Sequence, residues 1–503
     1  MNRRSFLAAA LASTALPVFA RSAPAPDYIE VARQLARLPH RDPAMVLPPP
    51  FDALTYDSYR AIRPAVGGAG NLALGTDVVA DLFPPGFYFQ DAVRVEIETD
   101  DGFQDVPYDP ALFSYADRYF DAPPQLTSAE MAEMGFSGAR LRSAFRSSGR
   151  LDEFLVIQGA TYFRAVSLDT VYGLSARALA LGTGEPTPEE FPVFTRLRLS
   201  RATESQTRID ALIESPSLTG ALTLMITPGE PTVTDIDTVL FPRRRLSTVG
   251  IAPLTSMYLK GPLRASVSDD FRPAVHDSDA LKILNGAGEV LWRPLANPAT
   301  LQTSAFQDAT PRGFGLVQSH RTFAGFEDQE AAYHRRPSAW VEPKGDWGRG
   351  SIVLVEIPTS DEFLDNIVTF WRPEQPLEAG GEYRFAYRIS WGSNPVPQGP
   401  FDTHVVQTRS GRVHDQPGHL QYIVDFAGIP SADIVLDLTG SNGTLYGASA
   451  YPLNARNQLR VGFRFDPGAA AVAELRLVLR DPEGRALSDV WLHRWTPARD
   501  GRP

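Results

Sequence analysis

EYRFAYRISW, residues 382–391, alternates large apolar side chains with smaller or polar ones along its whole length. The apolar set is Tyr383, Phe385, Tyr387, Ile389 and Trp391. Side chains of a β-strand point in turn to the two faces of a sheet, so this period of two predicts a strand with one buried face. Two later stretches, residues 459–465 and 475–479, repeat the pattern.

Turn-forming residues divide the rest of the chain into similar short pieces. The 503 residues include 39 glycines and 43 prolines, and most apolar runs between them are short. Many short strands separated by turns are typical of all-β proteins. Helices form the minority: residues 27–38 carry a helical stripe, and Thr127 with Glu130 matches a capping box before a short helix. We therefore predict an all-β fold.

A single breaker-rich segment, PEQPLEAGGE (373–382), interrupts the strand pattern just before residues 382–391. A chain of this length exceeds the roughly 250–300 residues of a single hydrophobic core, so two domains are expected. We predict a linker at 374–381. It would join a larger antiparallel β-sandwich over residues 26–373 to a smaller, immunoglobulin-like β-sandwich over residues 382–503.

The N-terminus has the features of an export signal. Arg3 and Arg4 are followed by Ser-Phe-Leu and an alanine-rich apolar run that ends near Ala20. The order Arg-Arg-x-Phe-Leu favours a twin-arginine signal over residues 1–20, with a general secretory signal as the alternative. No later segment approaches the roughly 18 uninterrupted apolar residues of a membrane span. We expect a periplasmic protein without a membrane-spanning segment.

Charge and cysteine content exclude several classes of function. The net charge is −11, from 48 basic and 59 acidic residues, and this balance does not favour binding to nucleic acid. The chain has no cysteine, which rules out disulfides, thiolate metal sites and cysteine nucleophiles.

Tryptophan, acidic and basic residues gather in two blocks, residues 271–298 and 333–374. Aromatic faces stack on the apolar faces of pyranose rings, and charged side chains bind the hydroxyls at the ring edge. The blocks therefore suggest a sugar-binding cleft. The alternative is ordinary core packing, since aromatic residues dominate the core of any β protein.

The blocks also supply carboxylates for acid–base chemistry. Cleavage of a glycosidic bond needs one carboxylic acid to protonate the leaving oxygen and one carboxylate to activate water or attack carbon. The candidates are Asp277, Asp279, Glu356, Asp361, Glu362 and Asp365. The alternative is that Asp361 and Asp365 are turn residues that bond to their own backbone.

Other chemistries match the sequence less well. GLSAR (173–177) lacks the second glycine of a serine-hydrolase elbow. His414 and His419 lie in a loop without helical metal-ligand spacing, and HDSD (276–279) lacks the glycine and distal glutamate of a calcium loop. We expect neither a metal site nor a cofactor.

Long stretches of the mature chain resemble the periplasmic glucan biosynthesis family (OpgG and OpgD, also called MdoG and MdoD). The resemblance is carried by FDALTYDSYRAIR (51–63), GATYFRAVSLDTVYGLSARALAL (159–181), GIAPLTSMYLKGP (250–262), HDSDAL (276–281), LWRPLANP (291–298), YHRRPSAWVEPKGDWGRGSIVLVEIPT (333–359) and DEFLDNIVTFW (361–371). It implies a galactose-mutarotase-like N-terminal sandwich, an immunoglobulin-like C-terminal sandwich and a role in making β-1,2-linked periplasmic glucans. The leader slightly favours the OpgD branch.

Active members of that family are similar to inverting endo-β-1,2-glucanases, and some relatives transfer the glucan chain instead. The resemblance implies that Asp365 is the general acid and Asp277 the general base, acting through waters. The substrate-binding residues it implies are Tyr333, Arg336, Trp340, Trp292 and Glu362. Two departures stand out: Phe363-Leu364 precedes Asp365 where small polar residues are expected, and the loop at 393–404 matches no family pattern.

Two other functions stay open at this stage. The protein is alternatively a non-catalytic glucan-binding partner of a membrane glucosyltransferase, in which the aspartates only form hydrogen bonds. A third hypothesis is a mutarotase-like or structural sandwich protein. The predicted partners are β-1,2-glucan, a membrane glucan glucosyltransferase and a second copy of the chain in a homodimer.

Overall fold

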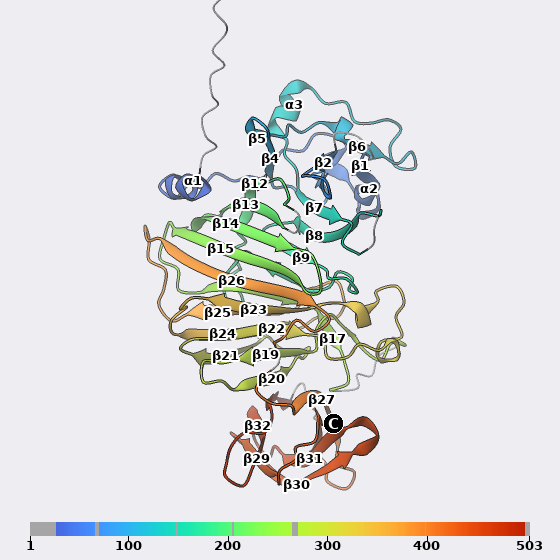
Figure 1. The fold of residues 1–503 in the computed structure, drawn as a ribbon, viewed down its shortest axis with the longest axis vertical. Helices are drawn as coiled ribbons and strands as arrows, with labels where there is room; N and C mark the ends of the chain where they lie inside the picture. Colours follow the sequence, from blue (N-terminus) through green and yellow to red (C-terminus); the bar gives the residue numbers. More distant parts are fainter. Residues whose placement is uncertain are drawn as a thin grey trace, which may run out of the picture.

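The structure is a computed structural model that describes residues 27–497, apart from 66–69, 147–148, 204–205, 264–269 and 398. The export signal predicted at residues 1–20 lies outside this part of the chain. Figure 1 shows an elongated molecule built almost entirely of strands, with a few short helices near one end. Within the described residues, no helix has the length and apolar character needed to cross a membrane. The prediction of an all-β protein built from β-sandwiches is confirmed.

One sheet extends from end to end of the molecule (Figure 1). Among the described residues it has 14 strands. In spatial order these are Val435–Gly440 (β29), Ala473–Arg480 (β32), Val490–Trp495 (β33), Val290–Pro294 (β20), Ala280–Leu284 (β19), Gly313–Val317 (β22), Ser338–Lys344 (β23), Tyr383–Gly392 (β26), Thr232–Pro242 (β15), Leu218–Thr227 (β14), Thr207–Glu214 (β13), Val193–Leu199 (β12), Arg94–Thr99 (β4) and Gly102–Asp105 (β5).

A second sheet packs against the middle of the first. Its strands, in spatial order, are Asn71–Ala73 (β2), Val78–Phe83 (β3), Gly138–Ser143 (β7), Asp152–Gln158 (β8), Tyr162–Ala165 (β9), Ser175–Arg177 (β10), Val249–Ser256 (β16), Ile367–Pro373 (β25), Gly350–Glu356 (β24) and Gln302–Asp308 (β21). Leu179–Leu181 (β11) also pairs with β16.

The main hydrophobic core lies between these two sheets. Phe163 of β9 and Trp391 of β26 meet across it, with ring centroids 6.3 Å apart. Tyr387, Ile389 and Trp391 are all fully buried, which confirms the alternation predicted for residues 382–391. The period of two thus places the aromatic face of β26 in the core, because a strand inside a sandwich buries one face.

The C-terminal sandwich has a core of its own. Its outer sheet contains His404–Arg412 (β27), Leu420–Ala427 (β28), Gln458–Asp466 (β31) and Thr444–Leu453 (β30). Its other face is the end of the long sheet, strands β29, β32 and β33. There β33 pairs in parallel with β20, and Trp491 lies opposite Trp292. The two sandwiches are therefore joined by a continuous sheet and by tryptophans that share the second core.

The predicted linker at 374–381 precedes a strand that pairs within the long sheet, and the division into two domains stays a prediction. β26 pairs with β15 and β23 in the long sheet, so the chain enters the C-terminal sandwich only after Gly392. The predicted linker, 374–381, connects β25 of one sheet to β26 of the other and is packed in place. The backbones of Leu377 and Leu246 exchange two hydrogen bonds, and Leu377 is buried. Prolines and glycines mark a chain reversal equally well within a domain and between domains.

The remaining elements are small. The α-helices are Tyr28–Leu35 (α1), Tyr56–Arg60 (α2) and Ser128–Glu133 (α3), and the 3₁₀ helices are Phe51–Ala53 (η1), Pro110–Leu112 (η2), Phe323–Gly325 (η3), Tyr333–Arg335 (η4) and Asn454–Arg456 (η5). The predicted helix at 27–38 and the predicted capping box at Thr127 and Glu130 are both present. Two ribbons complete the fold: Ile62–Pro64 (β1) with Phe113–Tyr115 (β6), and Tyr258–Lys260 (β17) with Val275–His276 (β18).

Candidate active site

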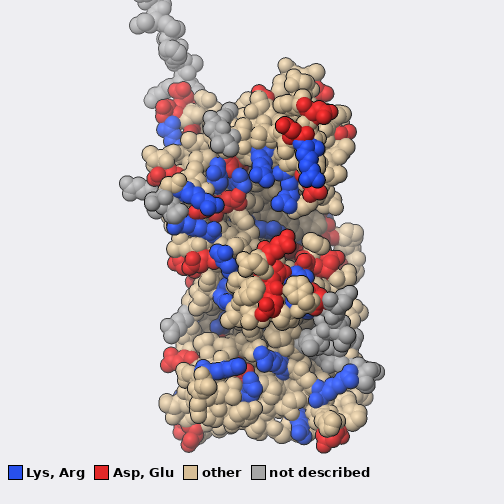
Figure 2. Space-filling view, turned by 90° about the vertical axis from the view of Figure 1, so that its right-hand side faces the viewer, with Lys and Arg blue, Asp and Glu red and all other residues tan. Residues whose placement is uncertain are grey.

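The β17–β18 ribbon lies on the side of the molecule that Figure 2 turns toward the viewer. This face is hollowed, with Lys and Arg side chains gathered above the hollow and Asp and Glu side chains below it (Figure 2). Two pockets, of about 740 and 950 Å³, lie around α1 and residues 41–49 and contain none of the predicted site residues. The carboxylates predicted from the sequence are carried by segments next to the β17–β18 ribbon.

Asp277 follows directly after β18 and is almost completely buried, with 3% of its surface exposed. Its backbone N–H donates to the carbonyl of Met257, at 2.9 Å, which fixes the chain just beyond the ribbon. Burial raises the pKa of Asp277 to about 6; the guanidinium of Arg336 opposes this rise and the negative charge of Asp365 adds to it. Asp277 is thus poised to change its charge near neutral pH.

Arg336 and Tyr333 surround this carboxylate. Arg336 donates from Nη1 to Oδ1 of Asp277, and its guanidinium lies 4.2 Å from the centre of the Tyr333 ring. The side chain of Arg336 packs on Gly173, where a Cβ atom would lie only 2.9 Å from it. A larger residue at 173 would displace Arg336. The GLSAR segment therefore contributes a close backbone approach to the site.

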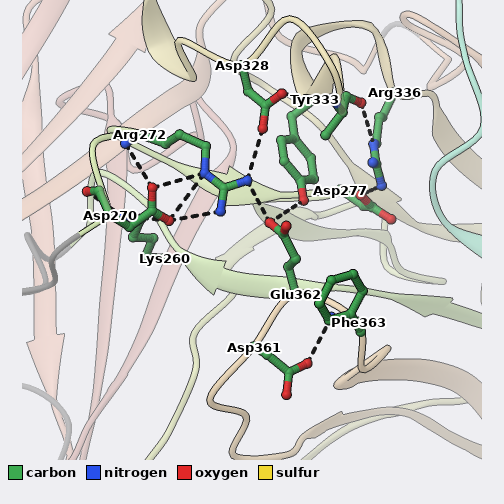
Figure 3. A network of polar contacts seen from close by, with 11 residues as sticks. Lys260, Asp270, Arg272, Asp277, Asp328, Tyr333, Arg336, Asp361, Glu362 and Phe363 are labelled. Atoms are coloured by element: carbon green, nitrogen blue, oxygen red, sulfur yellow. Dashed lines mark hydrogen bonds and ion pairs between the residues drawn. The ribbon is translucent and has the colours of Figure 1, made fainter.

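A network of charged and polar side chains joins Tyr333, next to Arg336, to the loop that precedes Asp365 (Figure 3). Arg272 is its centre: its guanidinium donates three hydrogen bonds to Asp270, at 3.0, 3.2 and 2.9 Å, one to Asp328 at 2.9 Å, and one to Glu362 at 2.7 Å. Glu362 in turn accepts from the hydroxyl of Tyr333 at 2.9 Å. The guanidinium of Arg272 therefore connects its own segment to those of Asp328 and Glu362, which are far apart in sequence.

Asp365 is positioned by its neighbour in the sequence. Asn366 is fully buried; its side chain accepts from the N–H of Tyr258 at 2.8 Å and donates to the carbonyls of Tyr258 and Ile357 at 3.1 and 2.9 Å. These bonds fix the start of β25 against β17. The side chain of Asp365 itself is 30% exposed.

The contacts of the Asp365 carboxylate are long. The hydroxyl of Ser175 lies 3.5 Å from its Oδ2, and Nη2 of Arg164 lies 3.6 Å from the same atom. Phe363, two residues before it in the same loop, is 91% exposed. Asp365 therefore faces solvent from an anchored loop end, and a ligand can reach it.

Two predicted stacking residues do not join the site. Trp340 is 1% exposed, and its ring covers Gly313 on the neighbouring strand β22. Trp292 is 3% exposed and belongs to the core between the two sandwiches. Trp340 is enclosed by its neighbours, and the small exposed part of Trp292 lines a pocket between the two sandwiches, so a role of either residue in substrate binding stays a prediction. The alternative interpretation, core packing, applies to both.

The structure also adds residues that sequence reasoning did not single out, namely Arg164, Arg272, Asp328 and Asn366. Arg272 lies in the block 271–298, and Asn366 directly follows the predicted acid. These positions were the one sequence signal that could have indicated a role for either residue. Among the described residues, no group of three or more His, Asp or Glu side chains has an arrangement that could hold a metal ion.

These observations define an all-β protein with two carboxylates, held by separate segments, beside a hollowed face. The chain belongs to the periplasmic glucan biosynthesis family, since the sequence model of that family (Periplasmic glucan biosynthesis protein, MdoG) matches residues 26–495.

Individual relatives agree with the family assignment. Glucans biosynthesis protein G of Vibrio cholerae serotype O1 is 43% identical over 479 residues, which cover 93% of this chain and 86% of that protein. Proteins of the same name from Shewanella sp. W3-18-1 and Shewanella baltica are 42% and 41% identical over 483 and 480 residues, again 93% of this chain and 86% of theirs.

Proposed function

We propose that this protein works in the periplasm on β-1,2-glucan, as an inverting endo-glucanase or as a glucan transglycosylase. Family membership supports a role in glucan biosynthesis. The finer activity rests on one observation: Asp277 and Asp365 are close enough for the charge of one to raise the pKa of the other, yet each is held by different partners. An acid and a base that act at opposite sides of one bond must lie near each other and be held independently.

In the proposed reaction, Asp365 acts as general acid and Asp277 as general base. Asp365 gives a proton to the bridging oxygen as the glycosidic bond breaks. Asp277 takes a proton, through water, from the nucleophile that attacks the anomeric carbon from the other side. If the nucleophile is water the product is a shorter glucan, and if it is a sugar hydroxyl the product is a transferred chain.

The neighbouring side chains suit substrate binding. Arg336, Tyr333 and Glu362 place a cation, an aromatic ring and a carboxylate beside Asp277. Hydroxyl groups on a sugar ring can donate to Glu362 and accept from Arg336. We propose these three as substrate-binding residues. A membrane glucosyltransferase partner and a homodimer stay predictions.

The test is to incubate the mature protein with linear β-1,2-glucan and to follow product size, linkage and anomeric configuration by chromatography and NMR. The Asp365→Asn variant should lose turnover and keep glucan binding. Asp361→Asn is the matched control, because Asp361 lies in the same exposed loop and, in the described part of the chain, its carboxylate accepts only from the N–H of Phe363. It should keep wild-type turnover.

Each outcome has a definite meaning. Short β-1,2 oligomers of inverted configuration, from wild type alone, support the glucanase, and rings or new linkages support the transglycosylase. Unchanged polymer with saturable binding contradicts both activities and supports the non-catalytic glucan-binding role.

A further inference from the structure

A pocket of about 240 Å³ lies where the two sandwiches meet. We call it the junction pocket; its walls include Trp292, Val317, Gln318, Arg321, Asn394 and Val396. It combines strands of the large sandwich with the 393–396 loop and the start of β27. The pocket is smaller than the roughly 300–1,000 Å³ typical of sites for drug-sized ligands, so it fits one small ring better than a chain.

The walls of the junction pocket are divided by chemistry. Trp292, Val317 and Val396 supply apolar surface, whereas Gln318, Arg321 and Asn394 supply polar groups. A pyranose ring has the same division, with apolar faces and hydroxyls around its edge. This combination favours a sugar over a purely apolar ligand.

Arg321 provides free hydrogen-bond donors in this pocket. Its guanidinium donates to the carbonyl of Arg336 at 2.8 Å and to the hydroxyl of Ser338 at 3.0 Å. In the described part of the chain, no carboxylate lies within ion-pair distance of it. A guanidinium has five N–H groups, so donors remain for a ligand, and a part-buried arginine without an ion pair is uncommon.

The charges around the junction pocket favour a neutral ligand. Lys282 is paired with Asp489, with 3.3 Å between Nζ and Oδ2. Asp279 and Glu230 act on Arg321 from beyond ion-pair distance. The described lining contains the cations Lys282 and Arg321 and no carboxylate, and Asp489, Asp279 and Glu230 balance these cations from outside the lining. The pocket therefore needs no anionic ligand to balance its charge, and hydroxyl groups can accept from its donors.

Gln318 and Arg321 also hydrogen-bond to the backbone of segments that form the candidate active site. Gln318 donates from Nε2 to the carbonyls of His276 and Tyr333, at 3.1 and 3.3 Å, and His276 directly precedes Asp277. Arg321 holds the carbonyl of Arg336, which is the ion-pair partner of Asp277. A ligand that moves Gln318 or Arg321 therefore acts on the segments that position Asp277 and Arg336.

We propose that the junction pocket binds a single neutral saccharide unit, and that its occupancy changes turnover in the active site. Binding stands on the pocket alone, whereas the effect on turnover rests on the proposed function. The two sites are coupled through Gln318 and Arg321, so the effect of saccharide on turnover must disappear when the pocket is filled.

The test is a titration of the mature chain with D-glucose, followed by saturation-transfer NMR. Val396→Phe fills the pocket from the loop and is expected to weaken glucose binding about tenfold or more. Val472→Phe is the matched control, because Val472 is 40% exposed and lies away from the pocket, on the turn before β32. It should bind glucose as the wild type does.

Asn394→Trp provides a second block from the exposed rim of the pocket, and thermal melting checks that both variants fold. Glucose binding that is unchanged in both folded variants, or absent in the wild type, overturns the proposal. Preferential binding of inorganic phosphate to the same residues also overturns it, since an anion would then be the ligand. Glucose should change glucan turnover in the wild type and in Val472→Phe but not in Val396→Phe.

A protein with no turnover on β-1,2-glucan would contradict the proposed function while leaving the binding result intact. Absence of glucose binding with normal turnover on β-1,2-glucan would contradict the junction-pocket proposal and leave the proposed function intact. The two proposals therefore fail separately.

Discussion

The two proposed catalytic carboxylates are held in opposite ways. Asp277 is buried directly after a strand and ion-paired with Arg336, whereas Asp365 is partly exposed and its side-chain contacts are 3.5 and 3.6 Å long. The base side is thus fixed by close packing and a charge partner. The acid side is fixed through its neighbour Asn366 and through the Glu362–Arg272 contact.

This difference suits the two tasks. A base that works near neutral pH needs a pKa near the working pH, and burial supplies it for Asp277. An acid that must meet a bridging oxygen deep in a polymer needs access, and the exposure of Asp365 supplies that. The two sides are linked by the hydrogen bonds of Tyr333 and Arg272 to Glu362 and by the charge of Asp365, which raises the pKa of Asp277.

Substitution of Asp277 should cause the largest loss of glucan turnover. Asp277→Asn is expected to lower glucan turnover by about 10²–10⁴-fold, because the proton acceptor is lost. The pKa of Asp277 lies above its ordinary value of 3.8, so its charge costs folding stability at neutral pH, and the neutral amide removes that cost. The variant should therefore melt no lower than wild type at neutral pH. Wild-type turnover in this variant would remove Asp277 from the reaction.

The pH dependence of turnover separates the two sides further. Asp277 must be ionised to accept a proton, so turnover should fall below a pH of about 6, by about tenfold per unit. Arg336 favours the ionised form, so Arg336→Gln should raise the pKa and move this acid limb to higher pH. The measurement is the pH profile of kcat in both proteins. A limb that stays in place in Arg336→Gln would show that another group sets it.

Removal of the Arg272 contact to Glu362, near Asp365, should lower turnover less. Arg272→Ala removes the contact to Glu362 and is expected to lower kcat about tenfold, since misplacement of a catalytic group by about 1 Å costs up to 10²-fold. Arg272→Lys should recover part of the loss. If both variants raise KM and leave kcat unchanged, Arg272 serves substrate binding instead. The pH limb set by Asp277 should not move in either variant.

The smallest effect on turnover is expected from the buried tryptophan on β23. Trp340→Leu should leave kcat and KM of the folded protein within about twofold of wild type, yet cost about 3 kcal/mol of unfolding free energy. Urea unfolding and steady-state kinetics measure the two effects. A large rise in KM without loss of stability would assign Trp340 to substrate binding.

Local patterns predicted the elements of this fold well. The alternation at 382–391 predicted β26, and the stripe and capping box predicted α1 and α3, because backbone geometry imposes these periods directly. The same patterns did not show which sheet a strand joins. β26 therefore looked like the first strand of the second domain, although it pairs inside the first.

The sequence alone determined the all-β class, and the resemblance to a family selected the two aspartates and three of their neighbours that the structure brings together. Only the tertiary structure decided that Trp292 and Trp340 are buried and that Arg272 links the acid and base sides. The reason is physical. Strand periodicity is a property of a few consecutive residues, whereas burial and charge pairing depend on segments such as 272, 328 and 362, which meet only when the sheets pack.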